Sequence, residues 1–383
     1  METQLKKWRR ALHERAETGF ALDKTKAYIS KQLQEMGILP KACGKAGIVA
    51  VIGKENGCCV LLRADMDALP MHEHTGLPFA CKNGNMHACG HDFHATMLLG
   101  AAQILKAREG ELKGCVKLLF QPAEEILEGA SDCIKAGVLT EPKPQAAFAL
   151  HVATGGDLPT GKLVLSSRET SAPAADYFEI EVVGKACHGA TPDKGIDALN
   201  VGAHILLALQ TLSAREQAVE NPFVLTVGKM QAGSAGNAIA EKAQMQGTLR
   251  AYDEATRAQI KKRLREIASA QAKAFGARAV VRFLGGCPTL KNDLTLVEFA
   301  EREIKKTFGE NAVMKTDGRG GGSEDFAYFS HEVPSLLLVI GAGEKNKGYE
   351  YPLHHSKTDF DENALVVGSK LLAHLAIKWA GLR

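Results

Sequence analysis

The sequence predicts an α/β protein with two domains, one inserted into the other. The chain has 383 residues, a length for which about two domains are expected. Near both ends of the chain, apolar strands alternate with helical segments, which is typical of a mixed, mostly parallel sheet covered by helices. The middle of the chain follows the order β-α-β-β-α-β, which is that of a ferredoxin-like unit. The outer segments are therefore expected to form one discontinuous domain, and the middle of the chain is expected to form a small domain inserted into it.

The discontinuous domain is expected to comprise 1–172 and 287–383. Helical apolar spacing runs from about residue 2 to residue 36. The strand candidates that follow have nearly all-apolar centres, which indicates strands buried on both faces. The expected strands are 47–53, 58–65, 114–121, 146–153 and 335–343, and the later helices are 95–110, 124–139, 294–309 and 362–381.

The inserted domain is expected to span 173–286. Six segments alternate between strand and helix in the ferredoxin-like order, as in an independent small domain. They are 177–184, 197–212, 223–233, 240–253, 254–276 and 278–285.

Composition and charge exclude several classes of protein. Hydrophobic residues make up 45% and charged residues 24%, as in ordinary globular proteins. The formal net charge is only +3 and the basic residues are scattered, so we expect no nucleic-acid partner. The N-terminus is charged and no apolar run reaches the roughly 18 residues of a membrane helix, so we expect no membrane partner. Nine cysteines, an odd number, favour reduced thiols and a cytoplasmic location.

Polar residues gather where the strands of the discontinuous domain end. Asp65 and Asp67 end one strand, Glu124 and Glu125 follow another, and His151 lies near the end of a third. In such sheets the active site lies beyond the carboxyl ends of the strands. We therefore expect three separate strands to deliver polar side chains to one edge.

The segment 85–94, NMHACGHDFH, contains one cysteine and three histidines. Gly90 separates Cys89 from His91, and glycine allows a turn tight enough for two such ligands to aim at one point. Thiolate and imidazole are groups that zinc and its borderline-soft neighbours prefer. The segment therefore predicts half of a metal site.

The paired glutamates fit the same site. Taken alone, Glu124 and Glu125 could be the solvated first turn of a helix, where the dipole favours acidic residues. Together with His151 and the segment 353–362, LHHSKTDFDE, they favour a metal centre. One carboxylate of the pair can bind metal while its neighbour takes a proton from a metal-bound water.

Nine segments, in order along nearly the whole chain, resemble one known family. They are WRRALHERAETGF, LLRADMDALP, MHACGHDFHATMLLGAA, FQPAEE, ALHV, CHGATPDKGIDAL, GNAIAEKAQMQGTLRA, GGSEDFAYF and LHHSKTDFDENAL. Together they resemble the amidohydrolase branch of the aminoacylase and carboxypeptidase G metallopeptidase family. That branch includes auxin-conjugate hydrolases, hippurate hydrolases and N-acetyl-diaminopimelate deacetylases.

The resemblance implies a site for two divalent metal ions. The wider family has a metal-binding histidine where this chain has Asp65, and in the amidohydrolase branch a cysteine supplies the missing ligand. The branch has its last ligand eight residues before the glutamate aligned with Glu362, which selects His354 over His355. The implied ligands are Cys89, His91, Glu125, His151 and His354.

The same resemblance implies which residues surround the ligands. Asp65, Asp67 and Asp92 are expected to lie behind them, and His87 and His94 are expected to support the site or the fold without binding metal.

The resemblance also implies a mechanism. A water that bridges the two metal ions would attack the amide carbonyl, with Glu124 as general base and then as acid toward the leaving amine. His188 of the inserted domain would donate a hydrogen bond to the oxygen that becomes negative. Asn237 and Arg250 would hold a substrate carboxylate. The segment 318–326 could supply a flexible substrate loop.

The expected function is hydrolysis of the amide bond of N-acyl amino acids. A dipeptidase or carboxypeptidase of the same family is an alternative, and a non-catalytic protein braced by zinc is an alternative of another class. Thiolate ligation favours zinc, with manganese, cobalt or nickel also possible. The inserted domain is expected to act as a lid and to form a homodimer.

Overall fold

The computed structural model of the protein describes residues 1–383 except 55–56, 319 and 382–383. Its chain forms two compact units. The segment Gly320–Ser323, which the sequence analysis assigned to the discontinuous domain, groups with the second unit. The first unit is Met1–Ser171, Lys291–Arg319 and Glu324–Arg383, and the second is Ala172–Leu290 and Gly320–Ser323.

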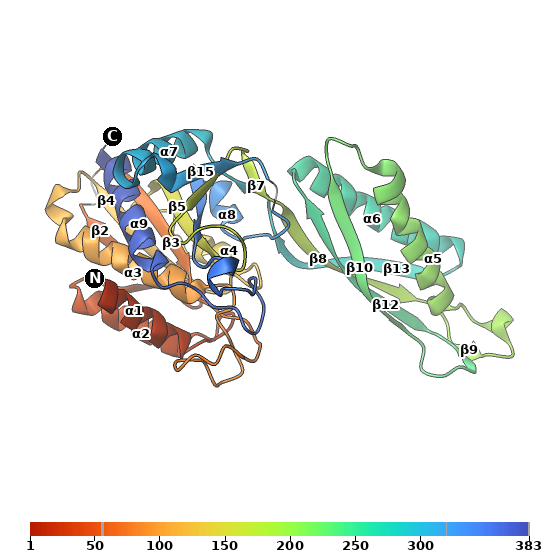
Figure 1. Ribbon diagram of the computed structural model, residues 1–383. Coiled ribbons are helices and arrows are strands. Elements are labelled where there is room, and N and C mark those ends of the chain that lie inside the picture. The colour runs from red at the N-terminus through yellow and green to blue at the C-terminus, as the bar shows by residue number, and fades with distance from the viewer. Residues whose placement is uncertain (55–56, 319, 382–383) are drawn as a thin grey trace. The chain divides into compact units, whose positions relative to one another are not determined.

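An eight-stranded sheet forms the centre of the first unit (Figure 1). Its strand order is β1-β2-β4-β3-β5-β16-β6-β15. The central strands β4, β3, β5 and β16 run parallel, whereas β1, β2 and β6 make antiparallel pairs. The predicted mixed, mostly parallel sheet is confirmed. The strands are β1 (Lys41–Cys43), β2 (Gly47–Gly53), β3 (Cys59–Asp65), β4 (Cys115–Gln121), β5 (Pro144–Ala153), β6 (Leu163–Ser166), β15 (Val313–Thr316) and β16 (Ser335–Gly341).

Helices cover both faces of this sheet. α1, α3, α7 and α9 pack together over one face, and the shorter α4 and α8 contact each other and the sheet away from that core. The helical spacing predicted over 2–36 forms two helices, and the helix predicted over 124–139 is shorter than expected. The helices are α1 (Glu2–His13), α2 (Asp23–Glu35), α3 (His91–Ala107), α4 (Gly129–Lys135), α7 (Leu294–Phe308), α8 (Ala327–Ser330) and α9 (Ala364–Gly381).

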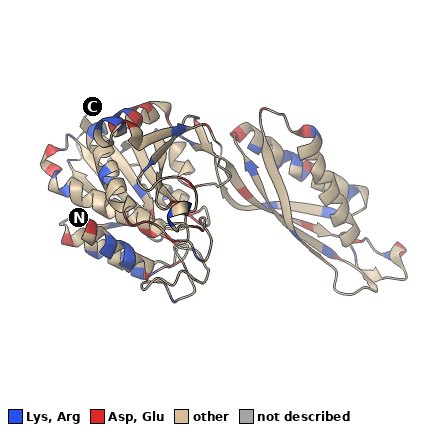
Figure 2. Ribbon diagram, viewed as in Figure 1, with Lys and Arg blue, Asp and Glu red and all other residues tan. Residues whose placement is uncertain are grey.

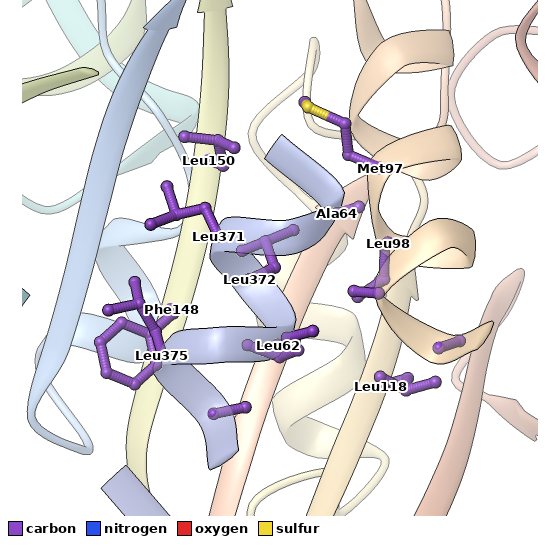
Figure 3. Close-up of a cluster of buried hydrophobic side chains, with 14 of the residues drawn as sticks. Leu62, Ala64, Met97, Leu98, Leu118, Phe148, Leu150, Leu371, Leu372 and Leu375 are labelled. Atoms are coloured by element: carbon purple, nitrogen blue, oxygen red, sulfur yellow. The ribbon is translucent and has the colours of Figure 1, made fainter. Parts of the chain in front are cut away.

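The main hydrophobic core lies between the sheet and helices α3 and α9 (Figure 3). Leu62 and Ala64 of β3 point into this core beside Phe148 of β5. Each fully buried leucine or phenylalanine stabilises the fold by about 1.5–3 kcal/mol. Because side chains alternate along a strand, the odd-numbered residues of β3, Arg63 and Asp65, face the opposite side.

The second unit contains a four-stranded antiparallel sheet with two helices packed on it. The strand order is β10-β12-β8-β13, in which the first and third long strands of the unit are central neighbours. Its core joins the sheet to α5 and α6. The elements are β8 (Ala174–Val183), β9 (Cys187–His188), α5 (Ala198–Thr211), β10 (Phe223–Ala232), β11 (Ala238–Ile239), β12 (Lys242–Ala251), α6 (Glu254–Ala274) and β13 (Arg278–Cys287). Two shorter strands, β7 (Thr170–Ala172) and β14 (Leu290–Lys291), form a separate pair.

Acidic and basic residues are interspersed along helices of both units, as Figure 2 shows for α6 and α7. Mixed charge of this kind suits a solvated surface better than a polyanion-binding stripe.

The sequence was expected to contain no segment long and apolar enough to cross a membrane, but helix α9 meets that requirement by length and composition. In the structure 61% of its 18 residues are buried. Leu371, Leu372 and Leu375 lie in the core shown in Figure 3, so the apolar character of α9 is accounted for by packing.

We predict that Gly100→Ala destabilises the first unit. A Cβ at Gly100 would lie 2.3 Å from Ser369 Oγ and 2.7 Å from Leu5 Cδ2, where α3 meets α9 and α1. Overpacking of this kind costs about 1–3 kcal/mol, which exceeds the helix propensity that alanine gains. Calorimetry should show a lower melting temperature for this variant. Gly110→Ala is the control because a Cβ there meets nothing within 4 Å. An unchanged melting temperature for Gly100→Ala would contradict the close packing.

Candidate metal centre

The candidate metal centre lies at the carboxyl ends of the central parallel strands. β3 ends at Asp65, β4 leads into Glu124 and Glu125, and β5 carries His151 near its end. Helix α3 begins at His91 beside them. The structure therefore brings together side chains that are remote in the sequence.

A left-handed glycine sets the turn between the cysteine and the first histidine. Gly90 has φ +81° and precedes the first residue of α3. A Cβ at this position would lie 2.3 Å from Val152 Cγ2 and 3.0 Å from Phe360 Cζ. Glycine is required both for the backbone conformation and for the space. The turn places Cys89 and His91 on the same side, as their spacing predicted.

The two imidazoles are oriented by backbone carbonyl groups. His91 Nδ1 lies 2.9 Å from the carbonyl oxygen of Asp67, and His151 Nδ1 lies 2.7 Å from that of Val152. A carbonyl oxygen only accepts, so Nδ1 is the donor in each ring and Nε2 is left for a metal. His151 Nε2 is 3.6 Å from Cys89 Sγ.

The loop after β4 is not the helix that the sequence predicted. Helix α4 begins only at Gly129, so residues 124–128 form a turn instead. Ala123 and Leu127 have φ of +55° and +57°, values that a non-glycine residue adopts only when its surroundings hold it there. The interpretation of the glutamates as a solvated first helical turn is therefore wrong.

Asp67 holds this loop. One of its carboxylate oxygens accepts from Glu124 N at 3.1 Å and the other from Glu125 N at 3.2 Å. Both glutamate side chains then approach His91 Nε2, with Glu124 Oε2 at 3.9 Å and Glu125 Oε1 at 3.8 Å.

His354, and not its neighbour, faces these groups. His354 Nε2 is 3.6 Å from Glu125 Oε2, and the backbone of His354 has φ +63°. The ring of His355 instead stacks on Tyr351 at a centroid distance of 4.5 Å, and its Nδ1 accepts from Lys357 N. Of the two histidines, His354 is therefore the one whose ring nitrogen lies near the other candidate ligands.

The donor set fits a pair of divalent cations. Among the described residues, His91 Nε2 and Glu125 Oε1 are buried without a hydrogen-bond partner, which is rare for buried polar atoms. Thiolate, imidazole and carboxylate are the usual ligands of zinc. Three overlapping groups have their ligand atoms within 4.8 Å of one another: Cys89 with His91 and His151, Cys89 with Glu125 and His354, and His91 with Glu124 and Glu125.

Burial and nearby charge both shift the pKa values of the site. Burial raises the pKa of the Cys89 thiol and raises the pKa of Glu125 to about 7. Burial lowers the pKa of His151 to about 4. Burial also disfavours a charged His91, yet nearby Asp65 outweighs this and the pKa of His91 is raised. The negative charge of Asp65 thus favours positive charge at His91, whereas the other three shifts show that burial disfavours the charged form of each group.

His94 does not take part in the centre. Its Nε2 accepts from Val152 N at 2.9 Å, so its Nδ1 donates to Asp65 Oδ1 at 2.5 Å. Both nitrogens are used, and Asp65 also accepts from Arg63 at 2.8 Å. His94 and Asp65 therefore support the site from behind, in the place where the wider family has a histidine ligand.

Asp92 belongs to a separate buried network. Its Oδ2 accepts from Arg9 Nε at 2.9 Å and lies 2.8 Å from His13 Nδ1. These contacts tie α1 to the start of α3. His87 is buried nearby, and burial lowers its pKa to about 3, so it is a neutral residue of this interior.

Three charged residues at this edge were not predicted from the sequence. Arg63, Glu324 and Asp325 are buried, and Arg63 donates a hydrogen bond to each of the two carboxylates. Two features of the sequence could have indicated these residues: an arginine inside an apolar strand, and the acidic pair in the motif SEDF. Neither feature shows that the arginine binds the acidic pair.

The remaining candidates lie in the second unit. His188 is on β9, which pairs with β11 so that Ala238 lies opposite His188 and Asn237 lies next to the pair. The carbonyl oxygen of Asn237 accepts from Gly189 N at 2.7 Å. The structure thus brings Asn237 and His188 together.

Arg250 lies on β12 and donates to Ser323 Oγ, within the same unit. Of the segment 318–326, Arg319 lies outside the described residues. Tyr252 Oη donates to the carbonyl oxygen of Gly320 at 2.6 Å, and Glu324 and Asp325 are buried, so the segment is held at both ends of its described part.

A mixed sheet with a thiol, imidazoles and paired carboxylates at its carboxyl edge defines a metal-dependent hydrolase. The sequence profile of the family described as peptidase family M20/M25/M40 matches residues 61–378. This chain therefore belongs to peptidase family M20/M25/M40. Within that class it is a metal-dependent amidohydrolase, which excludes the alternative of a non-catalytic protein braced by zinc.

Known relatives cover almost the whole chain. It is 36% identical over 379 residues to the N-acetylcysteine deacetylase of Bacillus subtilis (strain 168), covering 98% of this chain and 96% of the relative. It is 34% identical over 381 residues to thermostable carboxypeptidase 1 of Saccharolobus solfataricus, covering 97% and 94%. The crystal structure of the Bacillus subtilis YXEP protein, a dinuclear metal-binding peptidase of family M20, is 33% identical, covers 99% of this chain and 98% of that one, and has a TM-score of 0.82.

We predict that zinc binding releases protons. At pH 7 the metal-free protein holds a proton on the Cys89 thiol and partly on Glu125, whose pKa is about 7, and metal ligation requires both groups deprotonated. Zinc affinity should therefore fall as the pH is lowered from 7.5 to 5.5. Calorimetric titration in two buffers of different ionisation enthalpy measures the released protons. Cys89→Ala should weaken binding by more than about ten-fold, whereas Cys43→Ala, at a buried thiol elsewhere, should not. Heats that do not depend on the buffer would refute the prediction.

Proposed function

We propose that the protein hydrolyses the amide bond of N-acyl amino acids at a centre of two metal ions. The observation that carries this proposal is the arrangement of ligand atoms: Cys89 belongs to two of the converging groups, and Glu124 lies beside them. The similarity to an N-acetylcysteine deacetylase supports an N-acylated substrate.

In the proposed site Cys89, His91, Glu125, His151 and His354 would hold the ions. When bound, divalent ions polarise a carbonyl group and lower the pKa of water toward neutrality. Zinc suits the thiolate best, and manganese, cobalt or nickel could also be accommodated.

Glu124 would move the protons of the reaction. It is not needed to complete either of the two groups that share Cys89, and its carboxylate lies 3.9 Å from His91 Nε2. Burial, followed by the charges of Glu324 and Asp325, raises the pKa of Glu124 well above its usual value. A carboxylate with a raised pKa can accept a proton from the attacking water and return it to the leaving nitrogen.

The second unit would supply contacts to the substrate. His188 would donate to the carbonyl oxygen that becomes negative, an interaction worth about 3 kcal/mol in other enzymes. Asn237, which directly precedes the paired strand β11, would contribute to carboxylate binding. Arg250 would join them if the substrate carboxylate takes the place of its contact with Ser323.

A carboxypeptidase or dipeptidase is the second candidate, and the similarity to a carboxypeptidase favours it. Acetylated and unacetylated forms of the same dipeptide distinguish the two. Faster turnover of the acetylated form supports the N-acyl amino acid hydrolase, and the reverse order supports the peptidase.

We predict that Glu124→Gln abolishes turnover but retains metal. Loss of the general base should lower kcat by at least about 100-fold across a panel of N-acyl amino acids. Elemental analysis should find the same metal content as in the wild type. Glu128→Gln, at an exposed residue of the same loop, is the matched control. Full activity of Glu124→Gln would rule out the assigned role.

The inserted domain is also proposed to form a homodimer and act as a lid. Leu199 and Leu207 are exposed on α5, and Val224 is exposed on the edge strand β10. Apolar side chains next to an unpaired strand edge favour association with a second copy. The odd number of cysteines in the sequence, which favours reduced thiols, supports the cytoplasmic location proposed here.

We predict that Leu207→Arg converts a dimer to monomers. Leu207 is 68% exposed, and a charge there would oppose burial in an interface. Sedimentation velocity measures the change. Leu39→Arg is the control because Leu39 is 70% exposed in the first unit. A wild-type protein that sediments as a monomer would exclude the proposed assembly.

A further inference from the structure

One buried arginine binds several carboxylates near the proposed general base, Glu124. Arg63 is 3% exposed. Its Nη2 donates to Glu324 Oε1 at 2.8 Å and to Asp325 Oδ1 at 3.0 Å, and its Nη1 donates to Asp65 Oδ2 at 2.8 Å. Its Nε donates to Gln121 Oε1 at 2.9 Å. A single guanidinium thus serves three carboxylates from two distant parts of the chain.

Asp325 is fixed by further donors. It accepts from Gln121 Nε2 at 2.7 Å and from Ala130 N at 2.8 Å, in addition to Arg63. These bonds join the end of β4, the start of α4 and the residues before α8. Asp325 is thereby a structural member of the cluster.

Glu324 differs from Asp325 because fewer groups donate hydrogen bonds to its carboxylate. Its carboxylate is bound by Arg63, at 2.8 and 3.3 Å, and by the backbone N of Phe326 at 2.8 Å. An oxygen of Glu324 lies within 4.8 Å of one of Glu124. Buried ion pairs are often no more stabilising than apolar side chains of the same volume. Stabilisation of the fold by the ion pair with Arg63 therefore does not by itself explain why the carboxylates of Glu124 and Glu324 lie so close together.

The Glu124 carboxylate itself receives no protein hydrogen bond from the described residues. Its orientation must therefore come from packing and from the charges around it. Oxygens of Glu324 and Asp325 lie within 4.8 Å of one of Glu124 and form one group with it, whereas His91 Nε2, 3.9 Å from Glu124 Oε2, belongs to a separate group. Repulsion from Glu324 disfavours positions of the Glu124 carboxylate close to that residue, and attraction to positive charge favours positions close to His91.

We propose that Arg63 and Glu324 are positioning residues for the general base. Arg63 holds the Glu324 carboxylate near that of Glu124, and the negative charge of Glu324 keeps the Glu124 carboxylate turned toward the metal ligands. This inference rests on the proposed role of Glu124 in amide hydrolysis.

Two substitutions of Glu324 separate positioning by charge from bracing by shape. Glu324→Gln keeps the size and can still accept from Arg63 but removes the charge, whereas Glu324→Asp keeps the charge and shortens the side chain. Positioning by charge predicts that Glu324→Gln lowers kcat by on the order of ten-fold, with KM and zinc content unchanged, and that Glu324→Asp retains more activity. A bracing role predicts the opposite order of the two variants, and that order would overturn the proposal.

Asp176→Asn is the matched control. Asp176 is a buried carboxylate of the second unit that accepts from Arg257 Nε and Nη2 at 2.7 and 2.9 Å. This variant should lower the melting temperature without changing kcat. A general sensitivity of the enzyme to the loss of a buried ion pair would appear here as well.

Crystal structures of the zinc-loaded wild type and Glu324→Gln test the inference independently of activity. The Glu124 carboxylate should be displaced from the ligand cluster in the variant, and an unchanged position would overturn the proposal. If the wild type hydrolyses no N-acyl amino acid or peptide with metal restored, the proposed function fails, and the two structures still decide whether Glu324 positions Glu124.

Discussion

The carboxylate of Asp67 binds the backbone N–H groups of Glu124 and Glu125, and the metal centre depends on this contact. The backbone carbonyl of the same residue orients His91. Asp67, a single residue that follows β3, thus determines both the conformation of the loop after β4 and the orientation of His91 at the start of α3. The positive φ values of the loop cost about 1–3 kcal/mol each and persist because bonds of this kind hold the backbone.

The other charged side chains at the carboxyl ends of the strands are arranged according to how their buried charges are compensated. Near the start of α3, Asp92 is matched by Arg9 and His13. Arg63, in contrast, faces more than one carboxylate, and His91 Nε2 and Glu125 Oε1 lack hydrogen-bond partners among the described residues. Arg9 Nη2 and the ring nitrogens of His87 also lack partners there, but only the second network places its unpartnered atoms among carboxylates and a thiol that can bind cations.

The sequence predicted those features that follow from local pattern and from the convergence of parallel strand ends. The Cys89-Gly90-His91 turn is a local property, and Asp65, Asp67 and His151 meet because their strands are neighbours in the sheet. The choice of His354 required the family pattern, since only the backbone conformation turns that ring toward Glu125.

Other features could not be predicted from periodicity. The segment 124–139 has the composition of a helix. Because the Asp67 carboxylate accepts from the backbone N–H groups at the start of this segment, the helix begins only at Gly129. Arg63 occupies an apolar strand as if it were a core residue, because its partners Glu324 and Asp325 are more than 250 residues away in the sequence. The strands β6 and β15 have only four residues each, too few for a clear pattern.

The grouping of Gly320–Ser323 with the second unit has a consequence for modularity. Arg250 and Tyr252 bind this peptide, and the next residue, Glu324, already belongs to the first unit. The small domain is therefore not formed by one continuous segment of the chain. A chimera that exchanges this domain with the equivalent part of a relative would have to include this second, glycine-rich stretch, or leave the polar groups that hold it without their native counterparts.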